Sequence, residues 1–136
     1  MFLLDTNVVS ELKKPRPHGA VVHWVSTLSR DELFVSAITI AEIQSGIELT
    51  RQQNKIKAFE LEQWLTQLTE TSQIIAIDHQ IAREWARIML GRSKILGEDA
   101  WIAATAKVAG LTVATRNIKD FATFNVKLHN PFTDTR

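Results

Sequence analysis

Four carboxylates stand at the ends of short apolar segments or just inside the helices that follow them, and they are Asp5, Glu42, Asp99 and Asp120. Clustered carboxylates repel one another unless a hard cation lies among them, and Mg²⁺ prefers oxygen ligands while keeping several of its waters. Such an ion lowers the pKa of a water and neutralises charge on a scissile phosphate. If the four segments meet in space, their chemistry is metal-assisted phosphodiester cleavage.

Each of these acids also has an ordinary structural interpretation. The triplet 5–7 (Asp-Thr-Asn) is typical of an Asx turn at a strand end. Thr39 and Glu42 match a capping box, in which Glu42 only satisfies backbone N–H groups. Asp99 suits the positive end of a helix dipole, and Asp120 suits a turn before Phe121. Spacing alone does not decide between the two interpretations.

The elements that must position the acids alternate along the chain. Apolar runs predict strands at 2–4, 32–36, 74–77, 111–114 and 126–128. Helical spacing of apolar residues predicts helices at 8–14, 21–28, 39–50, 56–68, 81–89 and 99–108, the fifth of them capped by Asp78. Strands that alternate with helices imply a mostly parallel sheet covered on both faces. Ligands bind beyond the carboxyl ends of such strands, where the four acids are expected to meet.

Whole-chain properties set limits on the function. The 136 residues, 45% of them hydrophobic, predict one domain spanning 1–136. The absence of cysteine excludes disulfides, thiolate zinc sites and a cysteine nucleophile. The N-terminus lacks the pattern of a signal peptide and no apolar run is long enough to cross a bilayer, so we expect a soluble cytoplasmic protein without a membrane partner. With a formal net charge of +1, nucleic acid must bind through a local patch.

Other polar and aromatic residues carry less information. The basic run at Lys13, Lys14 and Arg16 fits a solvated helix end or phosphate steering. Arginines 83, 87 and 92 fit a solvated helix face or an RNA path. Three of the tryptophans lie on apolar stripes, and only Trp101, close to Asp99, is a candidate for a role at the site. The four histidines show no metal-binding spacing, and nothing orients a pair as acid and base.

Taken together, four ordered sequence blocks resemble a known family. The blocks are 2–10 (FLLDTNVVS), 35–43 (VSAITIAEI), 99–106 (DAWIAATA) and 114–121 (ATRNIKDF). With Asn130-Pro131-Phe132 they span nearly the whole chain, and they resemble PIN-domain toxins of the VapC type, most of all the FitB-like branch.

The resemblance implies a three-layer α/β/α sandwich around a mostly parallel sheet, with Mg²⁺ or Mn²⁺ in an acidic pocket. It implies an endoribonuclease toxin of a toxin–antitoxin system that cleaves RNA, commonly tRNA, by a metal-activated water. The expected products carry a 5′-phosphate and a 3′-hydroxyl. It further implies a homodimer neutralised by a cognate antitoxin, through which the complex reaches its operator DNA.

The family's acidic positions map onto Asp5, Glu42 and Asp99. At the fourth position some members carry Asp where this chain has Asn117, and others use the residue three positions later, so we expect Asp120 to supply the charge and Asn117 to be a neutral neighbour. Asp5 and Asp99 are expected to hold the ion directly, and Glu42 and Asp120 through waters or a second ion. Two threonines, Thr6 and Thr115, are expected to hydrogen-bond to these carboxylates, and the orientation of Glu98 is left open.

Two other functions compete with the nuclease. A phosphoacceptor receiver domain is also a Mg²⁺-binding α/β unit of similar length, with Asp78 as a possible acceptor. However, Asp5 is followed by Thr6 and Asn7 rather than by a second acid. A catalytically weak PIN module would instead act with its antitoxin as a DNA-bound regulator, and Asn117 in place of an acid is the support for it.

Overall fold

The structure is a computed structural model that describes residues 1–93 and 97–133. The strands are β1 (Phe2–Leu4), β2 (Leu33–Ser36), β3 (Gln73–Ile75), β4 (Thr112–Ala114) and β5 (Leu128–His129). The α-helices are α1 (Thr6–Leu12), α2 (Gly19–Ser26), α3 (Ala37–Arg51), α4 (Lys55–Thr71), α5 (His79–Met89), α6 (Gly97–Ala109) and α7 (Ile118–Ala122). Two 3₁₀ turns, η1 (Arg30–Glu32) and η3 (Pro131–Thr133), complete this part of the chain. None of the helices just given is long and apolar enough to span a membrane.

The five strands form one parallel sheet in the order β3-β2-β1-β4-β5. Strand order therefore reverses between β1 and β4, where Leu4 lies beside Ala114. In open parallel sheets the crevice beyond the strand ends at such a reversal is the usual ligand site. Asp5 and Thr115 are the next residues along these two strands, so the topology places both at this crevice.

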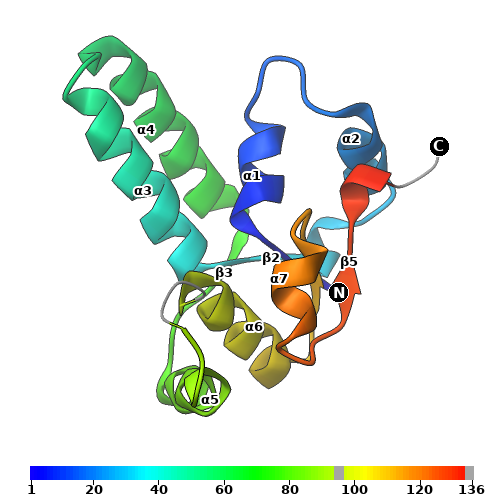
Figure 1. Ribbon diagram of the computed structural model, residues 1–136. Helices are drawn as coiled ribbons and strands as arrows, with labels where there is room; N and C mark the ends of the chain where they lie inside the picture. The colour runs from blue at the N-terminus through cyan, green and yellow to red at the C-terminus, as the bar shows by residue number, and fades with distance from the viewer. Residues whose placement is uncertain (94–96, 134–136) are drawn as a thin grey trace.

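Helices cover the two faces of the sheet, as Figure 1 shows, and each face has its own core. Because side chains alternate along a strand, Leu3 and Val113 point to the face covered by α5, α6 and α7. Leu4 and Val35 point to the opposite face, which α1, α2, α3 and α4 cover. The predicted α/β/α sandwich with a parallel sheet is confirmed.

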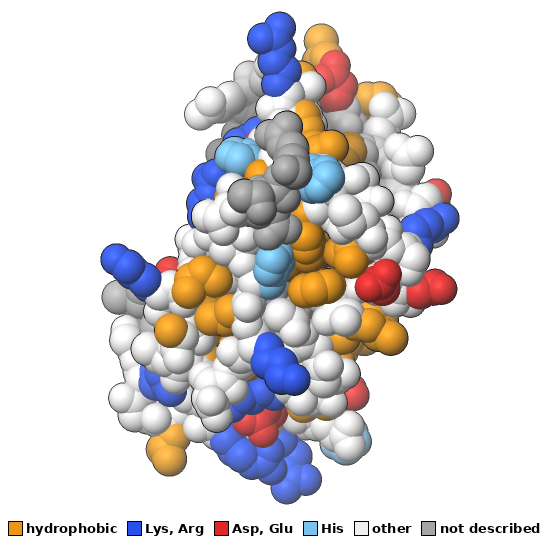
Figure 2. Space-filling model, turned by 90° about the vertical axis from the view of Figure 1, so that its right-hand side faces the viewer, with side chains coloured by type: hydrophobic (Ala, Val, Ile, Leu, Met, Phe, Trp, Pro, Cys, Tyr) orange, Lys and Arg blue, Asp and Glu red, His pale blue; other side chains and the backbone are white. Residues whose placement is uncertain are grey.

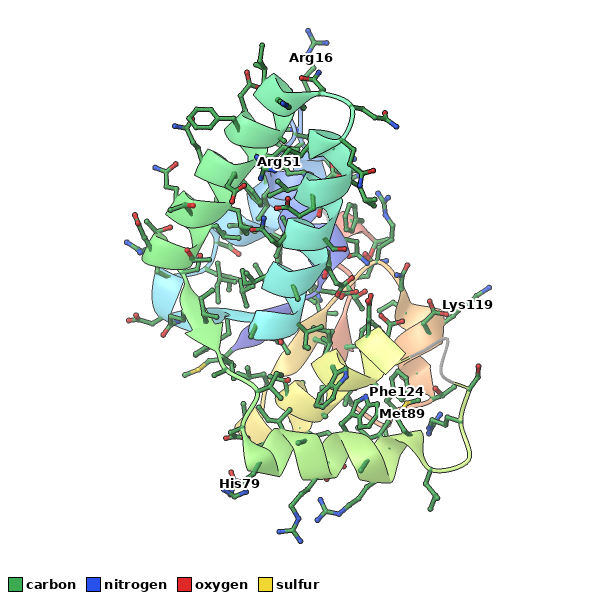
Figure 3. The ribbon with its side chains drawn as sticks, turned by 90° about the vertical axis from the view of Figure 1, so that its left-hand side faces the viewer. Arg16, Arg51, His79, Met89, Lys119 and Phe124 are labelled. Carbon is green, nitrogen blue, oxygen red and sulfur yellow. The ribbon has the colours of Figure 1, made fainter. Side chains whose placement is uncertain are left out.

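Small side chains let α6 pack closely on several sides. Its alanines at 100, 103, 104 and 106 are buried, and α5 lies against α6 on the side away from the sheet (Figure 3). Trp85 of α5 stacks on Trp101 of α6 with ring centroids 4.6 Å apart and planes within 9°. The Trp85 indole N–H also donates to the carbonyl of Gly97 at 3.2 Å. Trp101 therefore belongs to the α5–α6 packing, and the role at the site considered for it is not supported.

Two elements differ from the sequence predictions in ways that affect the acids. Helix α3 begins at Ala37 rather than Thr39, because the Ser36 hydroxyl accepts the Ile38 N–H at 3.0 Å and caps the helix. The capping-box interpretation of Thr39 and Glu42 is therefore wrong. The short helix α7 was not predicted, and it places Asp120 in a first helical turn rather than in a turn after β4.

Candidate active site

Asp5 directly follows β1 at the reversal of strand order and is only 4% exposed. Its backbone N–H donates to the Ala114 carbonyl at 2.9 Å, which joins the end of β1 to β4. The Asp5 carboxylate accepts hydrogen bonds from the Thr6 N–H at 2.8 Å, the Thr115 hydroxyl at 2.8 Å and the Asn7 amide at 3.1 Å. Burial nevertheless raises the pKa of Asp5, and the nearby charge of Asp120 adds to the rise.

Glu42 reaches the same crevice from α3. The Thr6 hydroxyl lies 2.9 Å from Glu42 Oε1 and 3.1 Å from the hydroxyl of the buried Thr39. Burial raises the pKa of Glu42 to about 7, and the charges of Glu98 and Asp5 and a hydrogen bond with Glu98 contribute. The Glu98 carboxyl therefore faces that of Glu42. Two carboxyls can hydrogen-bond only when one of them is protonated, so this pair shares a proton. This answers the question that the sequence left open about Glu98.

Asp99 and Asp120 come from the other face of the sheet, in the first turns of α6 and α7. Burial raises the pKa of Asp99 to about 6, and the charges of Asp5, Asp120 and Glu98 add to this. The charge of Asp120 thus helps to raise the pKa values of both Asp5 and Asp99, although Asp120 itself is exposed. The structure therefore brings all four predicted acids together, with Glu98 as a fifth.

The predicted polar neighbours divide into two groups. Thr6 and Thr115 make the expected hydrogen bonds to Glu42 and Asp5. Asn117 is exposed and its side chain does not cap α7, while its backbone N–H donates to the Thr115 hydroxyl at 2.9 Å. Asn117 therefore supports the site through its backbone.

Two supporting residues were missed in the sequence, Asn7 and Thr39. The Asn7 side chain donates to Asp5 and accepts the Arg116 N–H at 3.2 Å, so it links the start of α1 to the loop after β4. The signal for Asn7 was present, since an Asp-Thr-Asn triplet at a strand end puts two polar side chains beside the acid. Thr39 gave a signal too, but it was assigned to a cap that Ser36 makes instead.

The donor set of the crevice suits a hard, hydrated cation. All five acidic side chains offer oxygen, and burial together with the neighbouring negative charges raises the pKa values of Asp5, Glu42 and Asp99, which a divalent cation would lower again. Within residues 1–93 and 97–133, no three acidic or histidine side chains stand close enough to enclose an ion by themselves. Mg²⁺ retains several waters and is often held by one or two carboxylates, so the residues present fit this ion.

The raised pKa values predict how stability depends on pH without divalent cations. Glu42 and Asp99 bind protons in the folded state up to about pH 7 and 6, but in the unfolded chain only up to their ordinary values near 4.5 and 3.8. Between these limits the folded state holds more protons, so the free energy of unfolding falls as pH rises. We expect a loss on the order of 1 kcal/mol per group after solvent screening.

Urea denaturation in EDTA at pH 5 and pH 7.5 measures this loss. The variant Glu42→Gln, which cannot ionise, should reduce the difference between the two pH values. A stability that is constant or increases over this range would contradict the prediction.

Two further features lie away from the acids. Asp78 caps α5 by accepting the Ile81 N–H at 2.9 Å. The strand order also differs from the β2-β1-β3-β4-β5 order of receiver domains, so the structure does not support the phosphoacceptor interpretation.

A cleft of about 750 Å³ lies between α1, α4 and the sheet, and Val9, Leu12, Val35 and Trp64 are among the residues that line it. None of the five acids does.

Comparison with known proteins agrees with this geometry. Residues 2–126 match the PIN domain. The chain is 37% identical to Toxin FitB of Neisseria gonorrhoeae over 140 residues, which cover 98% of this chain and 100% of that protein. It is 34% identical to VapC ribonuclease Y4jK of Sinorhizobium fredii, covering 97% and 98% of the two chains.

A solved structure of FitAB bound to an IR36 DNA fragment superposes with a TM-score of 0.81 at 34% identity, covering 100% of this chain and 99% of that one. The resemblance seen in the four sequence blocks is thereby confirmed over almost the full length. This chain belongs to the PIN-domain family.

Proposed function

We propose that this chain is the toxin of a VapBC-type toxin–antitoxin pair and acts as a Mg²⁺-dependent endoribonuclease, with Mn²⁺ as a substitute ion. One observation supports the chemistry above the others. Carboxylates that follow β1 or lie in α3, α6 and α7 interact at the reversal of strand order, where burial and neighbouring charges raise the pKa values of Asp5, Glu42 and Asp99. The names of the relatives, a toxin and a VapC ribonuclease, support the class of activity.

The residues of the crevice have distinct roles in this proposal. Asp5 and Asp99 would hold the cation directly, while Glu42 and Asp120 would hold its waters or a second ion. When bound, the ion makes a water more acidic and offsets charge on the scissile phosphate. Thr115 and Asn7 fix the orientation of the Asp5 carboxylate, and Thr6 does the same for Glu42. Fixed ligands matter because a displaced ligand weakens both binding and catalysis.

The reaction is hydrolysis of one phosphodiester bond in RNA, with tRNA as the proposed target. A water oxygen bonds to phosphorus, and the bond from phosphorus to the 3′-oxygen of the preceding nucleotide breaks. That oxygen takes up a proton, so the products carry a 3′-hydroxyl and a 5′-phosphate.

The proposed partners follow from the same relatives. A cognate antitoxin would neutralise the toxin, and the complex would contact operator DNA through the antitoxin. The structure of FitAB with DNA supports this arrangement. We propose that the toxin itself is a homodimer.

Cleavage by the purified chain, freed of its antitoxin, tests the function. With labelled tRNA and Mg²⁺ we expect endonucleolytic products with a 5′-phosphate, and none in EDTA. Cleavage that persists in EDTA would exclude the metal mechanism. A folded, metal-binding protein that leaves RNA intact would favour the catalytically weak module.

The hydroxyl of Thr115 gives a prediction about metal binding. Thr115 is completely buried, and its hydroxyl donates to Asp5 while accepting the Asn117 N–H. Valine has nearly the same shape but no hydroxyl, so Asp5 loses one of the groups that orient it. We expect Thr115→Val to weaken Mn²⁺ binding by about 10-fold to 100-fold in calorimetric titration.

Thr105→Val is a matched control for this change. Thr105 is equally buried, and its hydroxyl donates to the Trp101 carbonyl within α6 at 2.8 Å. It should lose some stability while keeping its affinity for Mn²⁺. Thr115→Ser, which restores a hydroxyl, should recover most of the binding. Equal Mn²⁺ affinity in Thr115→Val and Thr105→Val would contradict the role of Thr115.

A further inference from the structure

The loop after β4 places one cation beside the acidic crevice. Arg116 directly follows Thr115, whose hydroxyl contacts Asp5, and its backbone N–H donates to Asn7 at 3.2 Å. Two hydrogen-bonded neighbours of Asp5 therefore fix the backbone of Arg116. Its residue is exposed, and its charge is not among the causes that shift the pKa of Asp5. The carboxylate on which the Arg116 charge acts is instead Glu11 of α1, whose pKa it helps to lower, so the side chain lies beside the acidic crevice on the α1 side.

An aromatic side chain supports the guanidinium. The Arg116 Cζ atom lies 3.8 Å from the ring centroid of Phe132 in η3. The ring of His18, at the start of α2, contacts the same phenylalanine edge-on with centroids 5.5 Å apart. Because the guanidinium is planar, packing against the ring restricts its motion while its in-plane N–H groups remain able to donate hydrogen bonds. Across residues 1–93 and 97–133, Arg116 forms no ion pair.

Other cations near this edge are used or face elsewhere. Lys14 pairs with Glu11 at 2.9 Å, and Lys13 lies over the ring of Trp64. Figure 3 shows Lys119 pointing outwards from α7, and Arg16 at the far end of the molecule. Lys and Arg side chains on the face seen in Figure 2 stand in separate groups between hydrophobic and acidic patches. Among these cations of residues 1–93 and 97–133, Arg116 is the one that directly follows a residue in contact with Asp5.

We propose that Arg116 binds a backbone phosphate of the RNA strand, adjacent to the phosphate that is cleaved. This inference rests on the proposed ribonuclease function. A polyanion approaching five carboxylates is repelled, and a net charge of +1 gives little attraction at long range. A guanidinium binds phosphate through two parallel hydrogen bonds, and the contact with Phe132 sets the orientation of Arg116 beforehand. The RNA strand therefore runs from the acidic crevice across the η3 side of the molecule.

Binding of RNA without cleavage tests the proposal. A short fluorescent single-stranded RNA is titrated in EDTA with the wild type, Arg116→Gln and Arg83→Gln, and anisotropy is followed at several salt concentrations. Arg83 is also an exposed arginine, on α5, beside Val108 at the end of α6 opposite to Asp99. Both variants lose the same charge. We expect Arg116→Gln to bind about tenfold more weakly at low salt and to lose roughly 0.7 from the slope of log affinity against log salt.

Kinetics separate a phosphate contact from a structural role. In Mg²⁺, Arg116→Gln should raise KM about tenfold while kcat changes by less than about threefold. Arg116→Lys keeps the charge and should recover part of the binding. Equal RNA affinity in Arg116→Gln and Arg83→Gln would overturn the proposal even if the wild type cleaves RNA. If the wild type does not cleave RNA, the proposed function fails, and the binding comparison still decides the role of Arg116.

Discussion

Replacing Asp5 by asparagine is expected to reduce RNA cleavage by about a thousandfold or more, because a lost metal ligand costs several kcal/mol of transition-state stabilisation. Asp5 interacts with most of the other residues of the site. It accepts hydrogen bonds from Thr6, Asn7 and Thr115, and its charge helps to raise the pKa values of Glu42 and Asp99. The measurement is the initial rate of RNA cleavage in saturating Mg²⁺.

The fold should survive this substitution. Asparagine has the shape of aspartate, and the Thr115 hydroxyl can reorient to accept one of its new N–H donors. Loss of a buried charge whose pKa is raised also removes a destabilising group. Circular dichroism and thermal melting establish that the variant is folded. Asp31→Asn, the same change at an exposed residue of η1, should cleave at the wild-type rate. A folded Asp5→Asn with undiminished activity would rule out the proposed site.

Addition of a divalent cation should raise the melting temperature at pH 7.5. Mg²⁺ or Mn²⁺ at about 100 times its dissociation constant stabilises the folded state by about 2.7 kcal/mol, if it binds that state alone. For a chain of this size the shift is roughly 5–10 °C. The reason is electrostatic, since the ion stabilises the ionised forms of Asp5, Glu42 and Asp99, whose pKa values are raised by burial and by neighbouring negative charges.

Asp99→Asn and an inert salt serve as controls for the cation. The variant removes a proposed direct ligand and should lose most of the shift, while its melting temperature in EDTA should equal or exceed that of the wild type. NaCl at matched ionic strength screens charges without coordinating, and it should give a much smaller shift. If NaCl stabilises the protein as much as Mg²⁺ does, the effect is screening and the metal proposal loses its support.

The order of elements and the meeting of the acids could be predicted because both depend on simple regularities. Alternating apolar runs indicate parallel strands, and their carboxyl ends share one edge, which placed Asp5 correctly beside the other acids. Asp99 and Glu42 followed from their places in the first turns of predicted helices. Glu42 shows the limit of this reasoning, since it lies further inside α3 than expected and reaches the crevice through Thr6.

The remaining details depend on which of several locally possible structures the tertiary packing selects, and the sequence alone does not show this. Ser36 and Thr39 are both good helix caps, and the cap is made by Ser36, whose backbone is still extended at the end of β2. Helix α7 is five residues long and too short to show a period. Whether Glu98 faces Glu42 depends on the rotation of α6 against α3, which is set by packing rather than by local sequence.

The backbone amide of Asp5 couples the acidic crevice to the opening of the sheet. Its N–H is bonded to the Ala114 carbonyl, so the residue that anchors the acidic crevice is also a rung between two central strands. Separating those strands would dismantle the crevice in the same step. Hydrogen exchange at this amide should therefore be among the slowest in the chain. Its protection factor would report the fraction of molecules in which the acidic crevice is intact.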